Sequence, residues 1–313
     1  MLMVSKVSLF LGQGERTVLL TLIGCLFLLL TSCGGGGIAI HPQVEYRLHG
    51  LCFSPYIELD PNQGAVVSAE RIAEFLDIIA PYCRWIRTFG ATHGLEEAPK
   101  LAKKRGLFVA AGCWLSSDKN TNEIEVNNLI KLIKEGWVDL AIVGSEVLFR
   151  HDLTEDEIIY YIRKVKETGI PSTTNDTWAE LLEHPRVMQE CDVIFANFYP
   201  YWEGVSIEQA IQSLQENYKR LKSSAGNKEV IVGETGWPSA GNPLNNAVPS
   251  LENAVSYILQ FVSWAKRENI KYFYFEAFDE PWKAKYEGPQ GAHWGIWDEK
   301  LKMKPGMIKV FNG

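Results

Sequence analysis

Val230-Ile-Val-Gly-Glu234-Thr-Gly-Trp-Pro238 is the stretch that points to the fold of this chain. Its β-branched, apolar start is typical of a buried strand, and the glycine and glutamate that follow indicate where this strand leaves its sheet. A second stretch, Leu140-Ala-Ile-Val-Gly-Ser-Glu146, has the same design. Two apolar runs that each end in a carboxylate predict two acids at one end of a parallel sheet.

Similar runs elsewhere bring the number of predicted strands to eight. The expected strands are Arg47–Phe53, Trp85–Phe89, Leu107–Cys113, Leu140–Gly144, Pro171–Thr174, Val193–Asn197, Val230–Gly233 and Tyr272–Phe275. Amphipathic stretches lie between them, for example Ser68–Ala80 and Glu123–Lys134, and both Thr154-Glu-Asp-Glu157 and Ser206-Ile-Glu-Gln209 have the pattern of a capping box. Strands that alternate with helices favour parallel pairing. Eight such units predict a closed α/β barrel of the (β/α)8 TIM type, with a doubly wound open sheet as the alternative.

The start of the chain has the features of a targeting segment. Two basic residues precede the apolar stretch Val18–Leu30, which is shorter than a usual membrane-spanning helix. The next residues, Leu30-Thr-Ser-Cys33, resemble a bacterial lipobox, which implies cleavage before Cys33 and lipidation of its thiol. A plain signal peptide and an N-terminal anchor helix are the alternatives.

These features divide the chain into three parts. Residues 1–32 are expected to be a signal peptide, residues 33–45 a lipidated cysteine with a Gly-rich tether, and residues 46–313 one barrel domain. The protein is then extracytoplasmic and held at a membrane by its lipid. Apolar residues make up 46% of the chain, so a substantial core is available. The net charge of −7 and the lack of a basic stripe disfavour a nucleic-acid partner.

Signatures of metal and cofactor chemistry are absent from the sequence. The six histidines lack metal-ligand spacing, and no P-loop, dinucleotide fingerprint or nucleophile elbow occurs, so we expect neither a metal nor a cofactor. Four cysteines, at positions 52, 83, 113 and 191, follow the predicted signal peptide. Disulfides would suit an exported protein, whereas the apolar surroundings of three of these cysteines equally fit free buried thiols.

Glu146 and Glu234 follow the fourth and seventh predicted strands, and in a barrel the strands deliver such residues to one catalytic face. A pair of carboxyls at one cavity can break a glycosidic bond, because one protonates the leaving oxygen while the other acts on the anomeric carbon. Burial or a neighbouring anion raises one pKa, and hydrogen bonds lower the other. The alternative is that both are structural acids paired with arginines such as Arg84 or Arg87.

Aromatic residues at the same strand ends predict a surface for sugar rings. The candidates are Tyr56, Tyr199, Tyr201, Trp202, Trp237, Trp282 and Trp294, and for any single one core packing is the alternative. Glu276, Glu280 and Lys283 follow the last predicted strand. Lys283 suits pairing with Glu280 and donation to sugar hydroxyls, and a solvated surface loop is the alternative.

Several segments resemble glycoside hydrolase family 17, the β-1,3-glucanases. The similar segments are Ile142-Val-Gly-Ser-Glu-Val-Leu-Phe-Arg150, Asn197-Phe-Tyr-Pro-Tyr201, Val232-Gly-Glu-Thr-Gly-Trp-Pro-Ser239, Phe275-Glu-Ala-Phe-Asp-Glu-Pro-Trp-Lys283 and His293-Trp-Gly-Ile296. They occur in the family's order between about Leu48 and Pro305, so the resemblance covers nearly all of the predicted barrel.

This resemblance implies a retaining hydrolase of the endo-1,3-β-glucanase type that acts on β-1,3-glucan, with the choice between endo and exo action left open. By position, Glu146 is then the general acid/base and Glu234 the nucleophile, with their carboxyls roughly 5–5.5 Å apart. The substrate-binding residues that it implies, together with the strand-end candidates, are Tyr56, Ser145, Asn197, Tyr199, Tyr201, Trp237, Glu276, Glu280 and Lys283. Hydrolysis and transglycosylation use the same residues, so both remain open.

One residue departs from the family pattern. Members usually carry Asn before the acid glutamate, where this chain has Ser145. Because the hydroxyl is shorter than the amide that reaches the sugar's 2-hydroxyl, we expect a weaker contact and expect Ser145→Asn to leave activity unchanged or raise it. A weakly active surface protein that binds glycan, and a related barrel acting on β-1,4- or β-1,6-glucan, are therefore further alternatives.

Overall fold

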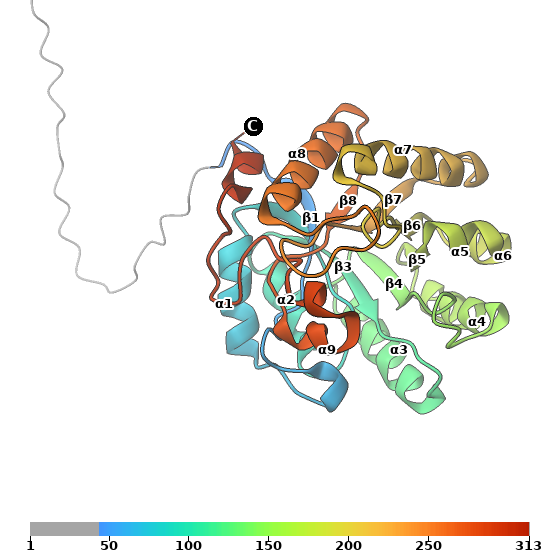
Figure 1. Cartoon of the computed structure of the whole chain (residues 1–313). Helices are drawn as coiled ribbons and strands as arrows, with labels where there is room; N and C mark the ends of the chain where they lie inside the picture. The colour runs from blue at the N-terminus through green and yellow to red at the C-terminus, as the bar shows by residue number, and fades with distance from the viewer. Residues whose placement is uncertain (1–43, 313) are drawn as a thin grey trace, which may run out of the picture. The chain divides into compact units, whose positions relative to one another are not determined.

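Eight parallel strands close into a barrel in this computed structural model, which describes residues 44–312 (Figure 1). The strands are β1 (Leu48–Cys52), β2 (Cys83–Arg87), β3 (Phe108–Cys113), β4 (Leu140–Ser145), β5 (Ser172–Thr177), β6 (Ile194–Asn197), β7 (Val230–Thr235) and β8 (Tyr272–Tyr274). Each pairs with its neighbours in chain order, and β8 returns to β1. The (β/α)8 prediction is confirmed and the open-sheet alternative is wrong. The predicted signal peptide, Cys33 and most of the tether lie outside the described residues.

Helices fill the connections and surround the barrel (Figure 1). The α-helices are α1 (Ala69–Ile79), α2 (Ala98–Lys103), α3 (Lys119–Lys134), α4 (Glu155–Lys166), α5 (Trp178–Glu183), α6 (Pro185–Glu190), α7 (Ile207–Ser224), α8 (Leu251–Arg267) and α9 (Ala284–Glu287). Short 3-10 turns are η1 (Pro61–Gln63), η2 (Leu95–Glu97), η3 (Pro281–Lys283), η4 (Pro289–Ala292) and η5 (Met307–Phe311). None of the helices within residues 44–312 is both long and apolar enough to cross a membrane.

Polar side chains fix where several helices begin. The Thr154 side chain accepts from the Glu157 N–H while the Glu157 carboxylate accepts from the Thr154 N–H, so the predicted capping box forms at α4. Ser206 precedes α7 as expected, but its side chain makes no capping hydrogen bond, so the second predicted box is wrong in its contacts. The backbone at Ser206 is extended, which ends the preceding loop without a side-chain cap.

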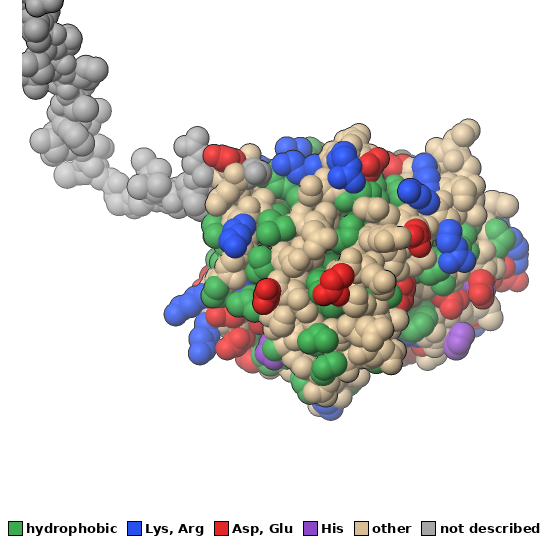
Figure 2. All heavy atoms as spheres, turned by 45° about the horizontal axis from the view of Figure 1, so that its top comes forward, with side chains coloured by type: hydrophobic (Ala, Val, Ile, Leu, Met, Phe, Trp, Pro, Cys, Tyr) green, Lys and Arg blue, Asp and Glu red, His purple; other side chains and the backbone are tan. Residues whose placement is uncertain are grey.

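The core lies inside the barrel and between the barrel and its helices. The four cysteines at positions 52, 83, 113 and 191 are all buried and all free, so burial rather than disulfide pairing accounts for them. Their distant places in the sequence correspond to separate strands or strand entrances, each packed with apolar neighbours. On the face seen in Figure 2, acidic and basic side chains are interspersed.

Candidate active site

The turn after β4 presents Glu146 in a left-handed backbone conformation, with φ of 55°. Such a φ is uncommon outside glycine, so neighbouring contacts must hold it. The Glu146 N–H donates to the Asn175 carbonyl on β5 at 2.7 Å. Two residues later, the Leu148 N–H donates to the buried Asp176 carboxylate at 2.9 Å. Arg150 closes the turn by donating to the Ser145 carbonyl at 2.5 Å.

Glu234 lies within β7, and three side chains from other strands or strand ends donate to its carboxylate. Arg87 at the end of β2 donates to Oε1 at 2.5 Å, and Asn175 on β5 lies 3.4 Å from the same oxygen. The Tyr199 hydroxyl donates to Oε2 at 2.7 Å. These donors fix the carboxylate in one orientation and suit a group that reacts as an anion.

Asn197 joins the two glutamates at one mouth of the barrel. Its Cα is the ladder partner of Glu234 between β6 and β7, and its Nδ2 donates to Glu146 Oε1 at 2.7 Å. Residues 88 positions apart in sequence are therefore brought to the same strand ends, as the sequence predicts. The carboxyl separation of roughly 5–5.5 Å stays a prediction.

The surroundings of Glu146 favour its protonated form. Burial is the largest cause, and the Glu234 carboxylate adds to it, so the pKa of Glu146 rises to about 7. The Asn197 amide opposes this shift, whereas the Asp176 carboxylate adds to it and Arg150 lowers it. Burial also raises the pKa of Asp176, to about 6. An acid that holds its proton near neutral pH, beside a carboxylate held by donors, is the arrangement that acetal cleavage needs.

The loop after β8 forms a buried charge cluster rather than a solvated surface. Lys283 donates to both oxygens of Glu276, at 2.7 and 2.6 Å, and pairs with Glu280 Oε2 at 2.7 Å. Ser54 donates to the other oxygen of Glu280 at 2.6 Å. The surface-loop alternative is therefore wrong, and the predicted pairing of Lys283 with Glu280 is confirmed. Because three carboxylate contacts occupy the ammonium, Lys283 orders the two acids rather than offering a free donor.

Two aromatic residues from the predicted sugar surface lie in the core. Tyr201 is 0% exposed and donates to the Asn242 carbonyl, and Trp237 is 1% exposed and donates to the Val248 carbonyl. The two rings meet edge to face, with their centres 5.7 Å apart, and both are buried against protein, so stacking on a sugar ring is disfavoured and their role in substrate binding stays a prediction. Tyr56 is also buried, with its hydroxyl directed to a backbone carbonyl.

Other aromatics keep an open face at the strand ends. Trp202 is 40% exposed after β6, and Trp114 is 39% exposed directly after β3. The Arg150 guanidinium lies 4.5 Å from the centre of the Trp114 ring and holds it in place. Trp294 is buried like Trp237, whereas Trp282 is partly buried.

Sequence reasoning placed the polar residues Thr174-Asn-Asp176 at the predicted active face but assigned them no role. Asn175 and Asp176 belong to β5 itself and contact Glu234 and the Glu146 turn. The sequence feature that could have revealed the roles of Asn175 and Asp176 is the polar run after Thr174, where this strand was expected to end. Arg87 pairs with Glu234, as the structural-acid alternative supposed, but it does so inside the mouth.

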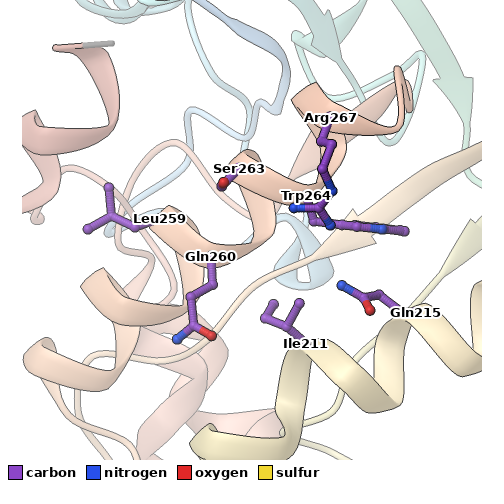
Figure 3. A pocket seen from close by; sticks show the side chains of 7 residues that line it. All are labelled: Ile211, Gln215, Leu259, Gln260, Ser263, Trp264 and Arg267. Carbon is purple, nitrogen blue, oxygen red and sulfur yellow. The ribbon is translucent and has the colours of Figure 1, made fainter.

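A groove elsewhere on the molecule is unrelated to these acids. It lies between α7 and α8 and holds no carboxylate (Figure 3). Its lining residues are Ile211, Gln215, Leu259, Gln260, Ser263, Trp264 and Arg267. These side chains come from the outer helices, and none is a ladder partner of the catalytic strands.

Comparisons with known proteins agree with this arrangement. Residues 50–295 match the BtgE/BtgC glycoside hydrolase domain. A glucan 1,3-beta-glucosidase of Candida albicans is 26% identical over 264 residues, which are 76% of this chain and 86% of that protein. The β-1,3-glucanosyltransferase of Rhizomucor miehei, from glycoside hydrolase family 17, is 31% identical with a TM-score of 0.74, covering 83% of this chain and 96% of its own.

An active-site mutant of the same Rhizomucor enzyme was solved in complex with laminaritriose, with 30% identity, a TM-score of 0.74 and the same coverage. The match of the family domain begins within β1 and extends to the loop beyond β8, so it includes β2 to β8 and both glutamates. The chain therefore belongs to the BtgE/BtgC glycoside hydrolase domain family and, with it, to glycoside hydrolase family 17.

Proposed function

We propose that this glycoside hydrolase cleaves β-1,3-glucosidic bonds in β-glucan by a retaining mechanism. The supporting observation is the asymmetry of the two acids at one mouth. Burial and the neighbouring anion raise the pKa of Glu146, while Arg87 and Tyr199 hold the carboxylate of Glu234. Relatives named as acting on 1,3-glucan, and one solved with laminaritriose, support the choice of substrate.

The mechanism assigns one step to each acid. Glu146 protonates the glycosidic oxygen while Glu234 attacks the anomeric carbon, which breaks the bond and forms a glycosyl-enzyme. Glu146 has then lost its proton and acts as a base toward the incoming acceptor. Attack by the acceptor oxygen releases Glu234 and restores the proton to Glu146. The Asn197 amide, which donates to Glu146 at 2.7 Å, orients this acid.

Reducing-sugar release from linear β-1,3-glucan tests this proposal. Glu234→Gln and Glu146→Gln should each lower turnover by at least about 1,000-fold, because each removes a group that the mechanism requires. Glu183→Gln, at an exposed acid at the end of α5, is the control and should retain full activity. Full activity in Glu234→Gln would remove Glu234 from the mechanism, and glucan binding without product release would favour a glycan-binding protein.

Stereochemistry is tested with azide. Glu146→Ala lacks the acid/base but keeps the nucleophile. On 2,4-dinitrophenyl β-laminaribioside, whose leaving group needs no protonation, azide should therefore attack the glycosyl-enzyme, restore turnover and give a β-configured glycosyl azide. An α-configured azide product would mean that the enzyme inverts. Matched assays on β-1,4- and β-1,6-glucans should give little product, and a preference for either would overturn the choice of linkage.

Transglycosylation is the second candidate function. The 31% identity to a β-1,3-glucanosyltransferase over nearly the whole of that chain favours it. Trp114 is 39% exposed and contacts Arg150 of the Glu146 turn, so it offers an aromatic surface on which an acceptor sugar can stack. Laminari-oligosaccharides supplied alone should then give products longer than the starting oligomer. Only shorter products would leave hydrolysis as the function.

We further propose that the protein acts outside the cytoplasm and that a lipid on Cys33 holds it at a membrane. The supporting feature is the Leu30-Thr-Ser-Cys33 segment behind an apolar stretch. Cys33→Ala should move the protein from the membrane fraction to the soluble fraction after cell breakage. An unchanged membrane fraction would point to an anchor other than this thiol.

A further inference from the structure

Ser145, which stands where the related enzymes usually carry Asn, forms hydrogen bonds that leave its hydroxyl only one direction in which to donate. Its Oγ accepts from Arg87 Nη2 at 3.0 Å and from Asn175 Nδ2 at 3.0 Å. A hydroxyl has two acceptor sites and one proton, so these two donors occupy both acceptor sites. Among residues 44–312, the Ser145 hydroxyl donates no hydrogen bond, so its proton is left for a ligand.

The orientation of the Asn175 amide is set by charge. Asn175 and Ser145 face each other as ladder partners between β5 and β4, and the amide also lies 3.4 Å from Glu234 Oε1. A carboxylate repels a carbonyl oxygen, so the amide must present its nitrogen to Glu234 and hence to Ser145. The opposite end, Oδ1, is buried and finds no hydrogen-bond partner among the described residues.

Space for this amide is provided by a glycine. A Cβ on Gly233, the residue before Glu234, would lie 2.3 Å from Asn175 Oδ1. In the Gly233-Glu234 pair of β7, the glycine therefore leaves space for the Asn175 side chain, and the glutamate supplies the acid. Leaving Oδ1 unpaired is unfavourable for folding, which argues that the amide is retained for its effect on Ser145 and Glu234 rather than for stability.

We propose that Asn175 is a positioning residue that, together with Arg87, forces the Ser145 hydroxyl to donate to the sugar bound at Glu234. Asn175 and Arg87 are 0% exposed, whereas Ser145 keeps 5%, so only the serine reaches the mouth. The Glu234 carboxylate lies against the anomeric carbon, which it attacks. The nearest sugar hydroxyl is therefore the 2-hydroxyl on the adjacent carbon, and this is the hydroxyl that Ser145 meets. Contacts to this 2-hydroxyl strengthen in the transition state.

This inference rests on the proposed function, and its test uses a pair of activated substrates. One is 2,4-dinitrophenyl β-laminaribioside, and the other lacks the 2-hydroxyl on the sugar that carries the aryl group. The ratio of their kcat/KM values measures how much the enzyme gains from that hydroxyl. Comparing the ratio between variants cancels the different intrinsic reactivity of the two substrates.

Ser145→Ala should lower this ratio by about tenfold or more, because it removes the donor. Asn175→Leu keeps the volume but frees one acceptor site of the serine, so it should lower the ratio by a similar factor. Asn175→Ala is the smaller replacement if the leucine disturbs folding, and thermal melts check each variant. The double variant of Ser145 and Asn175 should lower the ratio no further than either single variant.

The outcomes separate the claims. A ratio unchanged in Asn175→Leu but lowered in Ser145→Ala overturns the positioning role of Asn175, since a merely structural role changes melting without changing the ratio. A ratio unchanged in both variants overturns the serine contact as well. Failure of the wild type to release the aryl group from either substrate would overturn the proposed function, and this inference with it.

Discussion

Glu146→Gln is expected to stabilise the protein at alkaline pH while leaving its stability at acidic pH nearly unchanged. Burial, followed by repulsion from Glu234, raises the pKa of Glu146 from 4.5 to about 7. The folded state therefore holds this proton more tightly than the unfolded state, and the free energy of unfolding falls as the pH rises between those two values. At about 1.4 kcal/mol per pKa unit, the complete loss is at most about 3 kcal/mol.

Glutamine does not ionise, so the variant escapes this loss. With an unfolding entropy of about 2.1 cal/mol/K per residue over roughly 270 residues, 3 kcal/mol corresponds to about 5 °C. Melting followed by circular dichroism should show a small difference from the wild type at about pH 5 and a gain of about 5 °C at about pH 8. Glu299→Gln, at an exposed acid, is the control and should show no such change. A gain for Glu146→Gln that is equal at both pH values would refute the reasoning.

Three further predictions concern the supports of the site. Asp176→Asn keeps an acceptor for the Leu148 N–H but removes a charge that raises the pKa of Glu146, so the alkaline limb of the kcat/KM profile should move to lower pH. An unmoved limb would deny that coupling. Lys283→Met leaves two buried carboxylates without their cation, and urea unfolding at neutral pH should show a loss of about 3–5 kcal/mol. Gly233→Ala should lower kcat and cost about 1–3 kcal/mol in the same assay, because its Cβ would enter the space of a neighbouring amide; wild-type kcat would contradict this.

The barrel could be predicted because most of its strands are recognisable in the sequence. β3, β4, β6, β7 and β8 begin with apolar residues, many of them β-branched or aromatic, and burial of both faces makes such runs easy to recognise. β5 differs from them, because all six of its residues are polar and the strand continues beyond Thr174 to Thr177. Polar residues at a strand end usually indicate a loop, whereas here Asn175 and Asp176 are buried within the strand. Asn175 donates to Ser145 and Glu234, and Asp176 accepts from the Leu148 N–H.

The positions of the two glutamates were predictable because a carboxylate after a glycine-ended strand has few structural uses. The roles of the aromatics were not. Tyr201 and Trp202 are adjacent in sequence, yet one is fully buried and the other 40% exposed. Both residues are aromatic, so their types do not distinguish them. Only the path of the loop in the folded protein decides which ring packs into the core. The same applies to Lys283, whose burial depends on two carboxylates that the fold brings to it.

The contacts among Ser145, Asn175 and Gly233 limit which amino-acid substitutions this enzyme can accept. Asn at position 145 would bring a second amide to a hydroxyl site where Arg87 and Asn175 already approach to 3.0 Å. Contrary to the expectation from the sequence, Ser145→Asn alone is therefore expected to lower activity, and the swap should succeed only when a smaller residue replaces Asn175 in the same step. Directed evolution that samples one position at a time would meet a fitness valley here, whereas libraries that vary both strands together would cross it.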